Sequence, residues 1–529
     1  MSAPLADIIL PGSRPRRWPQ PLWWLAALAL AAALAIPFFL VDVPPVLDYP
    51  NHLARYFVLA HPDDEVLSRL YQPRWGVMPN LGMDLLGALL LKVTSVHVGG
   101  RLLLALSAFA PVIGVIIYNR VAFGRWLYWP LAAGLVAFNG VFHLGFMNFL
   151  LSLGLAFIAG AGWMALRRRG HHWRASAFGA TAAALLFFCH LFGVLLFALL
   201  IGTQEIAYLL KARRAGALMA TETLRSIAVL VVAGAPALLL YLASPLASGV
   251  AAPAAIAGVF YKLWALLTAF MTTSIDLTLW SAVIVLALIA MAWRRIALAP
   301  GFSIAFGILM LAYVAAPSEI KGGTFVDVRL GLMIALLLFA GIEPRLPARL
   351  GIVAAVLFAA LIGARTVYIS TTWIGHRQAV AELRSAIASI APGAKVMMAR
   401  GRPVGDVEAG RPEWILPGIS RLDTQLSALM VVERRAFWPL LFADPAQQPL
   451  RVMPAFAPLT QSPGGPVIWA RLSQPFAEAE LQAAPYLRDW RNRFDHVLLI
   501  DPPTPLTPPP AGLTLQRATP YAVLYGVER

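Results

Sequence analysis

Charged residues are scarce in this chain of 529 residues, and cysteine is almost absent. Only 13% of the residues are Asp, Glu, Lys or Arg, whereas 59% are hydrophobic and the mean hydropathy is +0.72. Soluble domains carry about 25% charged residues, so this composition excludes a chain that is dissolved in water over its whole length. The single cysteine, Cys189, excludes an intramolecular disulfide, so a domain outside the membrane must fold without covalent cross-links.

Acidic residues are in the minority, which gives a formal net charge of +16 and a pI near 10.4. A basic balance is often typical of nucleic-acid binding, but here the basic residues form short clusters between long apolar runs. These runs, concentrated in the first 370 residues, have the length of about 20 residues that crosses a hydrocarbon core about 30 Å thick. The sequence therefore predicts a polytopic membrane protein and no nucleic-acid partner.

The apolar runs predict an all-α membrane domain of about eleven transmembrane helices. We expect the helices at 22–41, 99–118, 126–141, 148–166, 175–190, 191–210, 226–243, 278–293, 302–316, 329–342 and 350–368. With this count, every basic cluster falls on one side of the membrane, which the positive-inside rule assigns to the cytoplasm. The N-terminus is then cytoplasmic and the C-terminus extracytoplasmic. We expect the first helix to stay uncleaved, because Val41-Asp42-Val43 is a poor cleavage context.

Two domains are predicted, a transmembrane domain over residues 1–372 and a soluble extracytoplasmic domain over 373–529. The first includes the long outward loop 42–98, where we expect amphipathic helices lying in the membrane interface. The aromatic-rich stretch 245–270 is typical of a similar interfacial segment.

The tail has the pattern of a small α/β or α+β domain. A helical run is expected over His376–Ile390, and Pro392-Gly393 ends it. Strands are expected at Lys395–Ala399, at His496–Ile500 and at Tyr521–Val527. The tail contains no metal-ligand spacing, P-loop or nucleophile elbow.

The most informative segment, Leu47–Arg55, follows the first apolar run directly. If a helix begins near Pro50, Asp48 lies at its start, and His52 and Arg55 share one helical face. An acid, an imidazole and a guanidinium at a membrane surface can take a proton from an acceptor hydroxyl and hold a phosphate. The local sequence leaves it equally open that Asp48 only caps the helix.

The order of these features resembles the GT-C superfamily of polyprenyl-phosphate-sugar-dependent glycosyltransferases, especially protein mannosyltransferases and lipid A aminoarabinose transferases. In these families an acidic motif follows the first helix, as Asp48–Arg55 does here. The similarity covers roughly residues 40–150, with weaker similarity as far as residue 345. Within the first range it includes Met78–Met83, Lys92–Val98 followed by Gly100–Leu102, and Tyr118–Arg125.

The resemblance implies a GT-C-like fold and a sugar donor linked to polyprenyl phosphate, with an extracytoplasmic glycan, lipid or protein as acceptor. Asp48 would be the general base, with His52 beside it. Many relatives carry a second acid in the next outward loop, where the nearest residue here is Asn148. A divalent metal therefore stays an open question. His143 and His190 are further candidates for lining the site, although a lone histidine at a helix end is more often structural.

The last outward loop, Pro317–Arg329, predicts a phosphate site. A helix that begins near Asp327 directs its positive N-terminal dipole outward, and Lys321 and Arg329 add cations, so we expect these two, with Arg55, to hold the donor phosphate. The alternative is a surface ion pair, Asp327–Arg329 or Glu319–Lys321. Asp276 is another acid at the same face, which an N-cap role explains equally well.

These expectations combine into one function, a glycosyltransferase of a bacterial cytoplasmic membrane whose C-terminal domain is periplasmic. Its partners would be membrane lipids, the lipid-linked sugar and the acceptor. One alternative is a transporter or flippase for lipids or small molecules, but internal repeats and charges at mid-depth, which such proteins commonly show, are not evident. Another is a non-catalytic protein of envelope assembly, which the amide at Asn148 keeps open.

Overall fold

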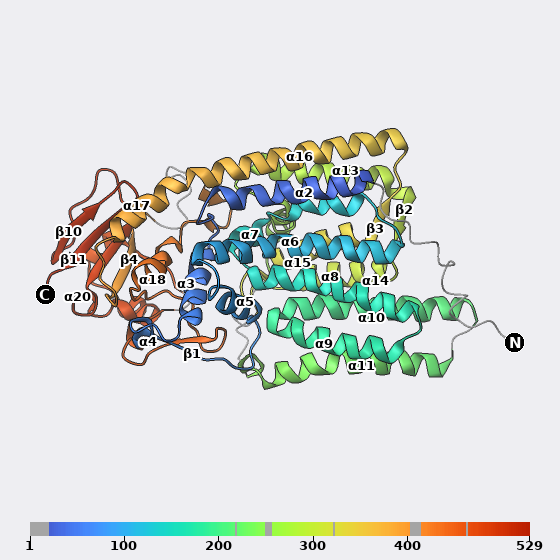
Figure 1. Cartoon of the computed structure of the whole chain (residues 1–529), viewed down its shortest axis with the longest axis horizontal. Coiled ribbons are helices and arrows are strands. Elements are labelled where there is room, and N and C mark those ends of the chain that lie inside the picture. The colour runs from blue at the N-terminus through green and yellow to red at the C-terminus, as the bar shows by residue number, and fades with distance from the viewer. Residues whose placement is uncertain (1–20, 217–218, 249–255, 321–322, 403–413, 462–463) are drawn as a thin grey trace.

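The computed structural model describes the chain except for residues 1–20, 217–218, 249–255, 321–322, 403–413 and 462–463. Within the described part, long helices lie side by side in a bundle, and a mixed α/β domain sits at one end of it (Figure 1). The polypeptide enters the bundle at the opposite end, so the first helix leads toward this domain.

Ten of the eleven predicted segments are α-helices. They are α2 (Pro21–Leu40), α6 (Val96–Phe123), α8 (Met147–Arg168), α9 (His172–Cys189), α10 (Leu191–Arg214), α11 (Ala220–Ala243), α13 (Ile275–Ala292), α14 (Phe302–Ala315), α15 (Val326–Gly341) and α16 (Ala348–Gly375). Seven helices in the described residues, those built on α2, α6, α8, α10, α11, α13 and α16, are long and apolar enough to cross a membrane. The chain is therefore an integral membrane protein.

The predicted helix at 126–141 is wrong as a single α-helix. The structure has the 3-10 helix η1 (Trp129–Val136), a break, and the short helix α7 (Gly140–Leu144). Asn139 causes the break, because its side chain accepts a hydrogen bond of 2.9 Å from the backbone N–H of Phe142 and so begins a new helix. Every residue of both elements except Trp129 is buried, so the apolar sequence fills the interior of the bundle.

The loop 42–98 contains helices, as predicted. They are α3 (Tyr49–Ala60), α4 (Leu67–Leu70) and α5 (Gly82–Leu90), with the strand β1 (Tyr71–Pro73) between the last two. However, all but two of the 12 residues of α3 are buried. This helix packs between α5, α6 and the C-terminal domain, so it does not lie with one face in lipid. The second stretch, 245–270, contains α12 (Val259–Leu267) and η3 (Thr268–Phe270).

The C-terminal domain contains a five-stranded mixed sheet in the order β10-β11-β9-β4-β8. β4 is parallel to β8 and β9, and the remaining pairs are antiparallel. The bounds are α17 (Arg377–Ile387), β4 (Val396–Arg400), β8 (Val467–Ile468), β9 (His496–Ile500), β10 (Leu513–Ala518) and β11 (Ala522–Val527). The predicted helix and three predicted strands are confirmed, whereas β8 and β10 were not predicted.

Shorter elements complete the described fold. They are η2 (Pro245–Ala247), η4 (Trp293–Arg295), β2 (Ile296–Leu298), β3 (Ile342–Pro344), β5 (Ile415–Leu416), β6 (Ser420–Arg421), η6 (Leu426–Ala428), α18 (Leu429–Arg434), β7 (Leu450–Val452), η7 (Ala457–Leu459), η8 (Trp469–Ser473), α19 (Glu478–Ala483), η9 (Pro485–Leu487) and α20 (Trp490–Arg493).

The C-terminal domain is joined to the loop 42–98 by paired backbone and by side chains. β7 pairs with β1 in an antiparallel ladder, and Arg435 forms an ion pair of 2.6 Å with Asp64. One hydrophobic core runs from the bundle into the sheet. The domain is therefore packed against the segment that carries the Asp48 motif.

Candidate functional site

Asp48 lies at the start of α3, where neighbouring backbone fixes its position. The N–H groups of Leu47 and Asp48 donate to the carbonyl oxygens of His143 and Leu144, at 2.9 and 3.2 Å. Gly145 follows with φ +90°, and a Cβ added there would come within 2.9 Å of the Asp48 Cβ. A residue larger than glycine would therefore displace Asp48.

The Asp48 side chain does not cap its helix, although it stands at the N-cap position, because it makes no hydrogen bond to the backbone N–H groups of α3. The interpretation of Asp48 as a simple cap is thus wrong. Burial raises the pKa of Asp48 to about 7, against the opposing influence of the Arg55 and Arg329 cations. The side chain remains partly exposed. A carboxyl group with these properties can accept a proton near neutral pH.

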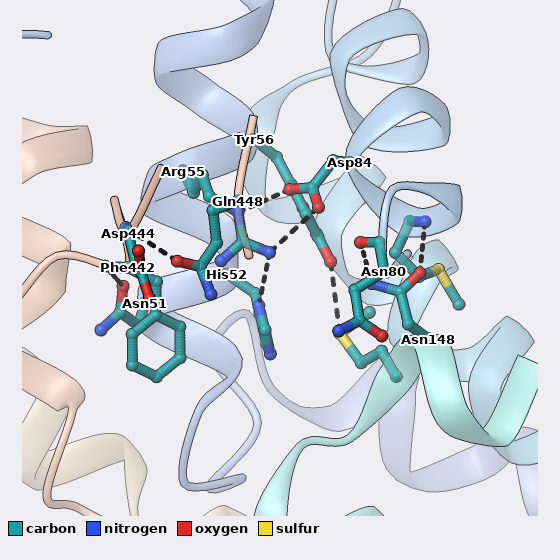
Figure 2. A network of polar contacts seen from close by, with 12 residues as sticks. Asn51, His52, Arg55, Tyr56, Asn80, Asp84, Asn148, Phe442, Asp444 and Gln448 are labelled. Carbon is teal, nitrogen blue, oxygen red and sulfur yellow. Dashed lines mark hydrogen bonds and ion pairs between the residues drawn. The ribbon is translucent and has the colours of Figure 1, made fainter. Parts of the chain in front are cut away.

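Arg55, one of the predicted phosphate-binding residues, is paired within the protein. Its Nε donates to Asp84 Oδ1 at 2.5 Å and its Nη2 to Asp84 Oδ2 at 3.2 Å, and both side chains are buried (Figure 2). Asp84 thus neutralises Arg55, and only Nη1, which is buried without a partner, remains available. Asp84 belongs to the site but was not among the predicted site residues.

His52 contacts Arg55, as the spacing of three residues predicts. Arg55 Nη2 lies 3.1 Å from His52 Nδ1, and because a guanidinium can only donate, Nδ1 is the acceptor. Burial and the Arg55 cation hold the pKa of His52 well below its usual value. A neutral imidazole in this place orients Arg55, which favours a positioning role for His52 over proton transfer.

Arg329, at the start of α15, is held by aromatic rings. Its Cζ lies 4.6 Å from the Phe146 ring centroid, 5.9 Å from that of Phe149 and 5.7 Å from that of Phe192. No ion pair with a carboxylate is found for it in the described part of the chain, and its Nε is buried without a partner. Cation–π contacts hold the guanidinium in place, and no carboxylate of the described residues forms an ion pair with it.

The surface pair Asp327–Arg329, considered as an alternative, is wrong. Asp327 is fully buried and forms its ion pair with Lys262, and it also accepts a hydrogen bond of 2.7 Å from Ser318. Lys262 in turn donates to the carbonyl oxygens of Tyr313 and Ala316. Asp327 therefore fixes the beginning of α15 and is not the partner of Arg329. Lys321, the other predicted phosphate ligand, lies outside the described residues.

Asp48, Arg55 and Arg329 are brought together from distant parts of the sequence. The backbone N–H of His52 donates to the Asp48 carbonyl oxygen at 2.9 Å, and the His52 ring contacts Arg55. Gly145 lies against Asp48, and the ring of the next residue, Phe146, contacts the guanidinium of Arg329. The structure thus brings a carboxyl group close to a cation that has no ion pair among the described residues.

Asn148 has a structural contact that explains its amide. Its Oδ1 accepts from the Met83 N–H in the first turn of α5, and its Nδ2 donates to the Asn80 carbonyl oxygen, both at 2.7 Å (Figure 2). A carboxylate could replace only the first of these bonds, because it cannot donate. Asn148 thus holds α5, the helix that presents Asp84.

The other predicted site residues differ in their surroundings. His143 is buried, and neither of its ring nitrogens has a hydrogen-bond partner among the described residues. His190 caps α10 by accepting from the Phe192 N–H at 3.1 Å, which keeps a phenylalanine beside Arg329. Asp276 is exposed in the first turn of α13, and Ser274 is the N-cap there, so the alternative that Asp276 is an N-cap is wrong.

The C-terminal domain supplies an aromatic ring to the site, which the sequence did not predict. The side-chain amide of Asn51 binds this domain. It donates to Gln425 Oε1 and the Leu440 carbonyl oxygen, and it accepts from the Phe442 N–H at 2.8 Å. The Phe442 ring then lies 5.5 Å from the His52 ring and 6.0 Å from Arg55 Cζ (Figure 2).

Among the described residues, no group of three His, Cys, Asp or Glu side chains could hold a metal ion. Of the two acids in this region, Asp84 has both oxygens bound to Arg55, and Asp48 alone supplies an uncommitted carboxylate.

The sequence matches no family model and no curated protein. Among solved structures, the crystal structure of ArnT from Cupriavidus metallidurans bound to undecaprenyl phosphate aligns with 96% of this chain and 98% of its own. The TM-score is 0.48 and the sequence identity is 14%. The alignment thus spans nearly the whole of both chains.

Proposed function

We propose that this protein is a membrane glycosyltransferase that moves a sugar from a polyprenyl-phosphate-linked donor to an acceptor hydroxyl. The observation that supports the proposal most is the proximity of Asp48 and Arg329. Asp48 is an uncommitted carboxyl group with a pKa near neutrality, and Arg329 is a cation without a carboxylate partner in the described part of the chain. Transfer from a glycosyl phosphate needs one group that takes a proton and one that stabilises a departing phosphate.

In the proposed reaction, the Asp48 carboxylate takes the proton of the acceptor hydroxyl as its oxygen attacks the anomeric carbon. The bond between that carbon and the phosphate oxygen breaks with inversion, and polyprenyl phosphate departs with the bonding electrons. Arg329 stabilises the negative charge that develops on this phosphate, and Arg55 Nη1 adds a hydrogen-bond donor. His52 and Asp84 keep Arg55 in place.

The compartment follows from the positive-inside rule. That rule assigns the end of the bundle with Asp48 and the C-terminal domain to the extracytoplasmic side, where nucleotide sugars are not available. A lipid-linked donor therefore fits this site, and a bacterial cytoplasmic membrane with a periplasmic C-terminal domain fits the topology. The acceptor would be a glycan, lipid or protein in that compartment.

The transfer assay uses the full-length protein in proteoliposomes that contain a polyprenyl-phosphate sugar with a radiolabelled sugar and extracts of envelope acceptors. We expect labelled acceptor and free polyprenyl phosphate in equal amounts, both dependent on the protein. Flux of the labelled lipid across the bilayer with no cleavage would instead support a flippase. Binding of the donor without turnover, in the presence of active extracts, would support an assembly protein.

The dependence of the transfer rate on pH gives a first quantitative prediction. A general base works only when deprotonated, and burial raises the pKa of Asp48 to about 7. We therefore expect kcat/KM to rise about tenfold per pH unit below about pH 6 and to level off above about pH 8. A profile that stays flat between these values, measured with the donor below its KM, would contradict the role of Asp48 as base.

The substitution Arg329→Gln tests the phosphate role. Removing the cation that faces the departing phosphate should lower kcat by about 100-fold, while the protein should fold, because no carboxylate in the described residues depends on Arg329. Arg329→Lys should retain part of the activity, since it keeps the charge. Arg488→Gln, on an exposed arginine of the C-terminal domain, serves as the control. Equal kcat values for Arg329→Gln and this control would exclude the role.

A further inference from the structure

A groove lies at the end of α2, and none of its lining residues belongs to the Asp48 site. It has a volume of about 390 Å³. Its lining consists of the last residues of α2, Phe39 and Leu40, the two residues that follow, Val41 and Asp42, and three arginines, Arg101, Arg377 and Arg384. The arginines come from α6 and α17, so three elements meet here. This set of residues, which we call the arginine groove, has no task in the proposed transfer reaction.

Two of the three arginines lack a carboxylate partner in the part of the chain that the structure describes. Arg101 donates to backbone carbonyls only, from Nε to His97 and from Nη1 to Phe38 and Val41, at 3.0–3.2 Å. Arg377 donates from Nη2 to the Leu40 carbonyl. Their charges are therefore not compensated by an ion pair.

Arg384 differs from these two, because acids neutralise it. It forms ion pairs of 2.6 Å with Asp42 and 2.8 Å with Glu433. The groove therefore has an excess of positive charge that comes from Arg101 and Arg377.

The contacts of Arg101 and Arg377 with α2 suggest a simpler role, since cations at the C-terminal end of a helix stabilise its free carbonyls. That role does not use all of their donors. A guanidinium has five N–H groups. Toward the described residues, Arg101 donates only from Nε and Nη1, and Arg377 donates only from Nη2. Donors and charge remain for a ligand in the groove.

The position of the groove indicates the kind of ligand. α2 is long and apolar enough to cross a membrane and ends at Leu40, so the groove lies at the bilayer surface. Phe39 is 82% exposed beside it, as expected for a side chain that faces acyl chains. Lipid phosphates lie at this depth, and arginine binds phosphate through paired N–H groups.

We propose that the arginine groove binds the phosphate group of a membrane lipid headgroup, with Arg101 and Arg377 as its ligands and the acyl chains against Phe39. The phosphate is held by charge and by the uncommitted N–H groups of the two arginines. Asp42 does not repel it, because its charge is engaged by Arg384.

The test measures lipid binding to the purified full-length protein in detergent, by native mass spectrometry. The probe is dioctanoyl phosphatidylglycerol, and dioctanoylglycerol, which has no phosphate, is the matched lipid. We expect the double variant Arg101→Gln/Arg377→Gln to bind the phospholipid at least about tenfold more weakly than the wild type. Binding of dioctanoylglycerol should be weak and equal in both proteins.

The control variant is Arg69→Gln/Arg74→Gln, which removes two exposed arginines from the loop 42–98 and should bind the phospholipid like the wild type. Since Arg101 also holds the end of α2, Arg377→Gln alone, on an exposed side chain, is the second variant and should weaken binding about threefold. Equal affinity of both groove variants and the wild type would overturn the proposal. Inorganic phosphate that binds as tightly as the phospholipid would overturn the lipid as ligand.

Discussion

Replacing Asp48 by asparagine is expected to lower the transfer rate about 1000-fold. General-base catalysis contributes roughly 100- to 10,000-fold, and no other uncommitted carboxylate lies beside Arg329 in the described structure. The amide has nearly the shape of the carboxylate, so the contacts of the Asp48 backbone with His143 and Leu144 should persist. The rate is measured with saturating donor in proteoliposomes, and the donor affinity of the variant by titration without acceptor.

The control for this variant is Asp63→Asn, an exposed acid in the same loop, which should leave the rate unchanged. Because burial opposes the charge of Asp48, the asparagine variant should unfold at the same temperature as the wild type or at a higher one at pH 8. Transfer at the wild-type rate by Asp48→Asn would remove Asp48 from the reaction, whatever the outcome for Arg329.

The spacing within one short segment was sufficient to predict part of the site. His52 and Arg55 share a helical face because they are three residues apart, and the structure places them in contact. The carboxylate that neutralises the charge of Arg55 belongs to Asp84, 29 residues further along the chain. Sequence periodicity describes neighbours within a helix but not which helix packs next to it, so it does not identify Asp84 as the partner of Arg55.

Arg329 illustrates the same limit. The sequence shows a basic residue directly after a polar loop, at the expected start of a helix. This pattern predicted that Arg329 binds a phosphate. The rings that hold it, Phe146, Phe149 and Phe192, lie on or beside α8 and α10. In a chain with 27 phenylalanines, no local pattern distinguishes these three from those that face lipid.

The C-terminal domain was predictable where its strands are buried. β4 and β9 are almost wholly buried and appear as apolar runs, whereas all residues of β10 after Leu513 are exposed and give no such pattern. β8 has only two residues. The docking of the domain through Asn51 and Phe442 depends on a contact between residues 391 positions apart, which no spacing rule contains.

The second large effect is expected from Asp84→Ala, which removes the partner of a buried arginine. Arg55 is 2% exposed and Asp84 0%, and breaking such a pair costs about 3–5 kcal/mol, because the remaining charge is left without compensation. We expect a marked fall in the unfolding temperature and loss of transfer. The unfolding temperature in detergent and the transfer rate after brief incubation at low temperature are the two measurements.

The control is Glu478→Ala, which breaks the exposed ion pair with Arg488 and should cost less than about 1 kcal/mol. The double variant Arg55→Met/Asp84→Leu separates stability from function, since apolar side chains can replace a buried ion pair without loss of stability. It should regain the unfolding temperature yet remain poorly active, because His52 loses its donor and the departing phosphate loses Arg55 Nη1. Full activity in this double variant would show that the pair only holds α3 against α5, and it would leave Asp48 and Arg329 as the whole of the catalytic site.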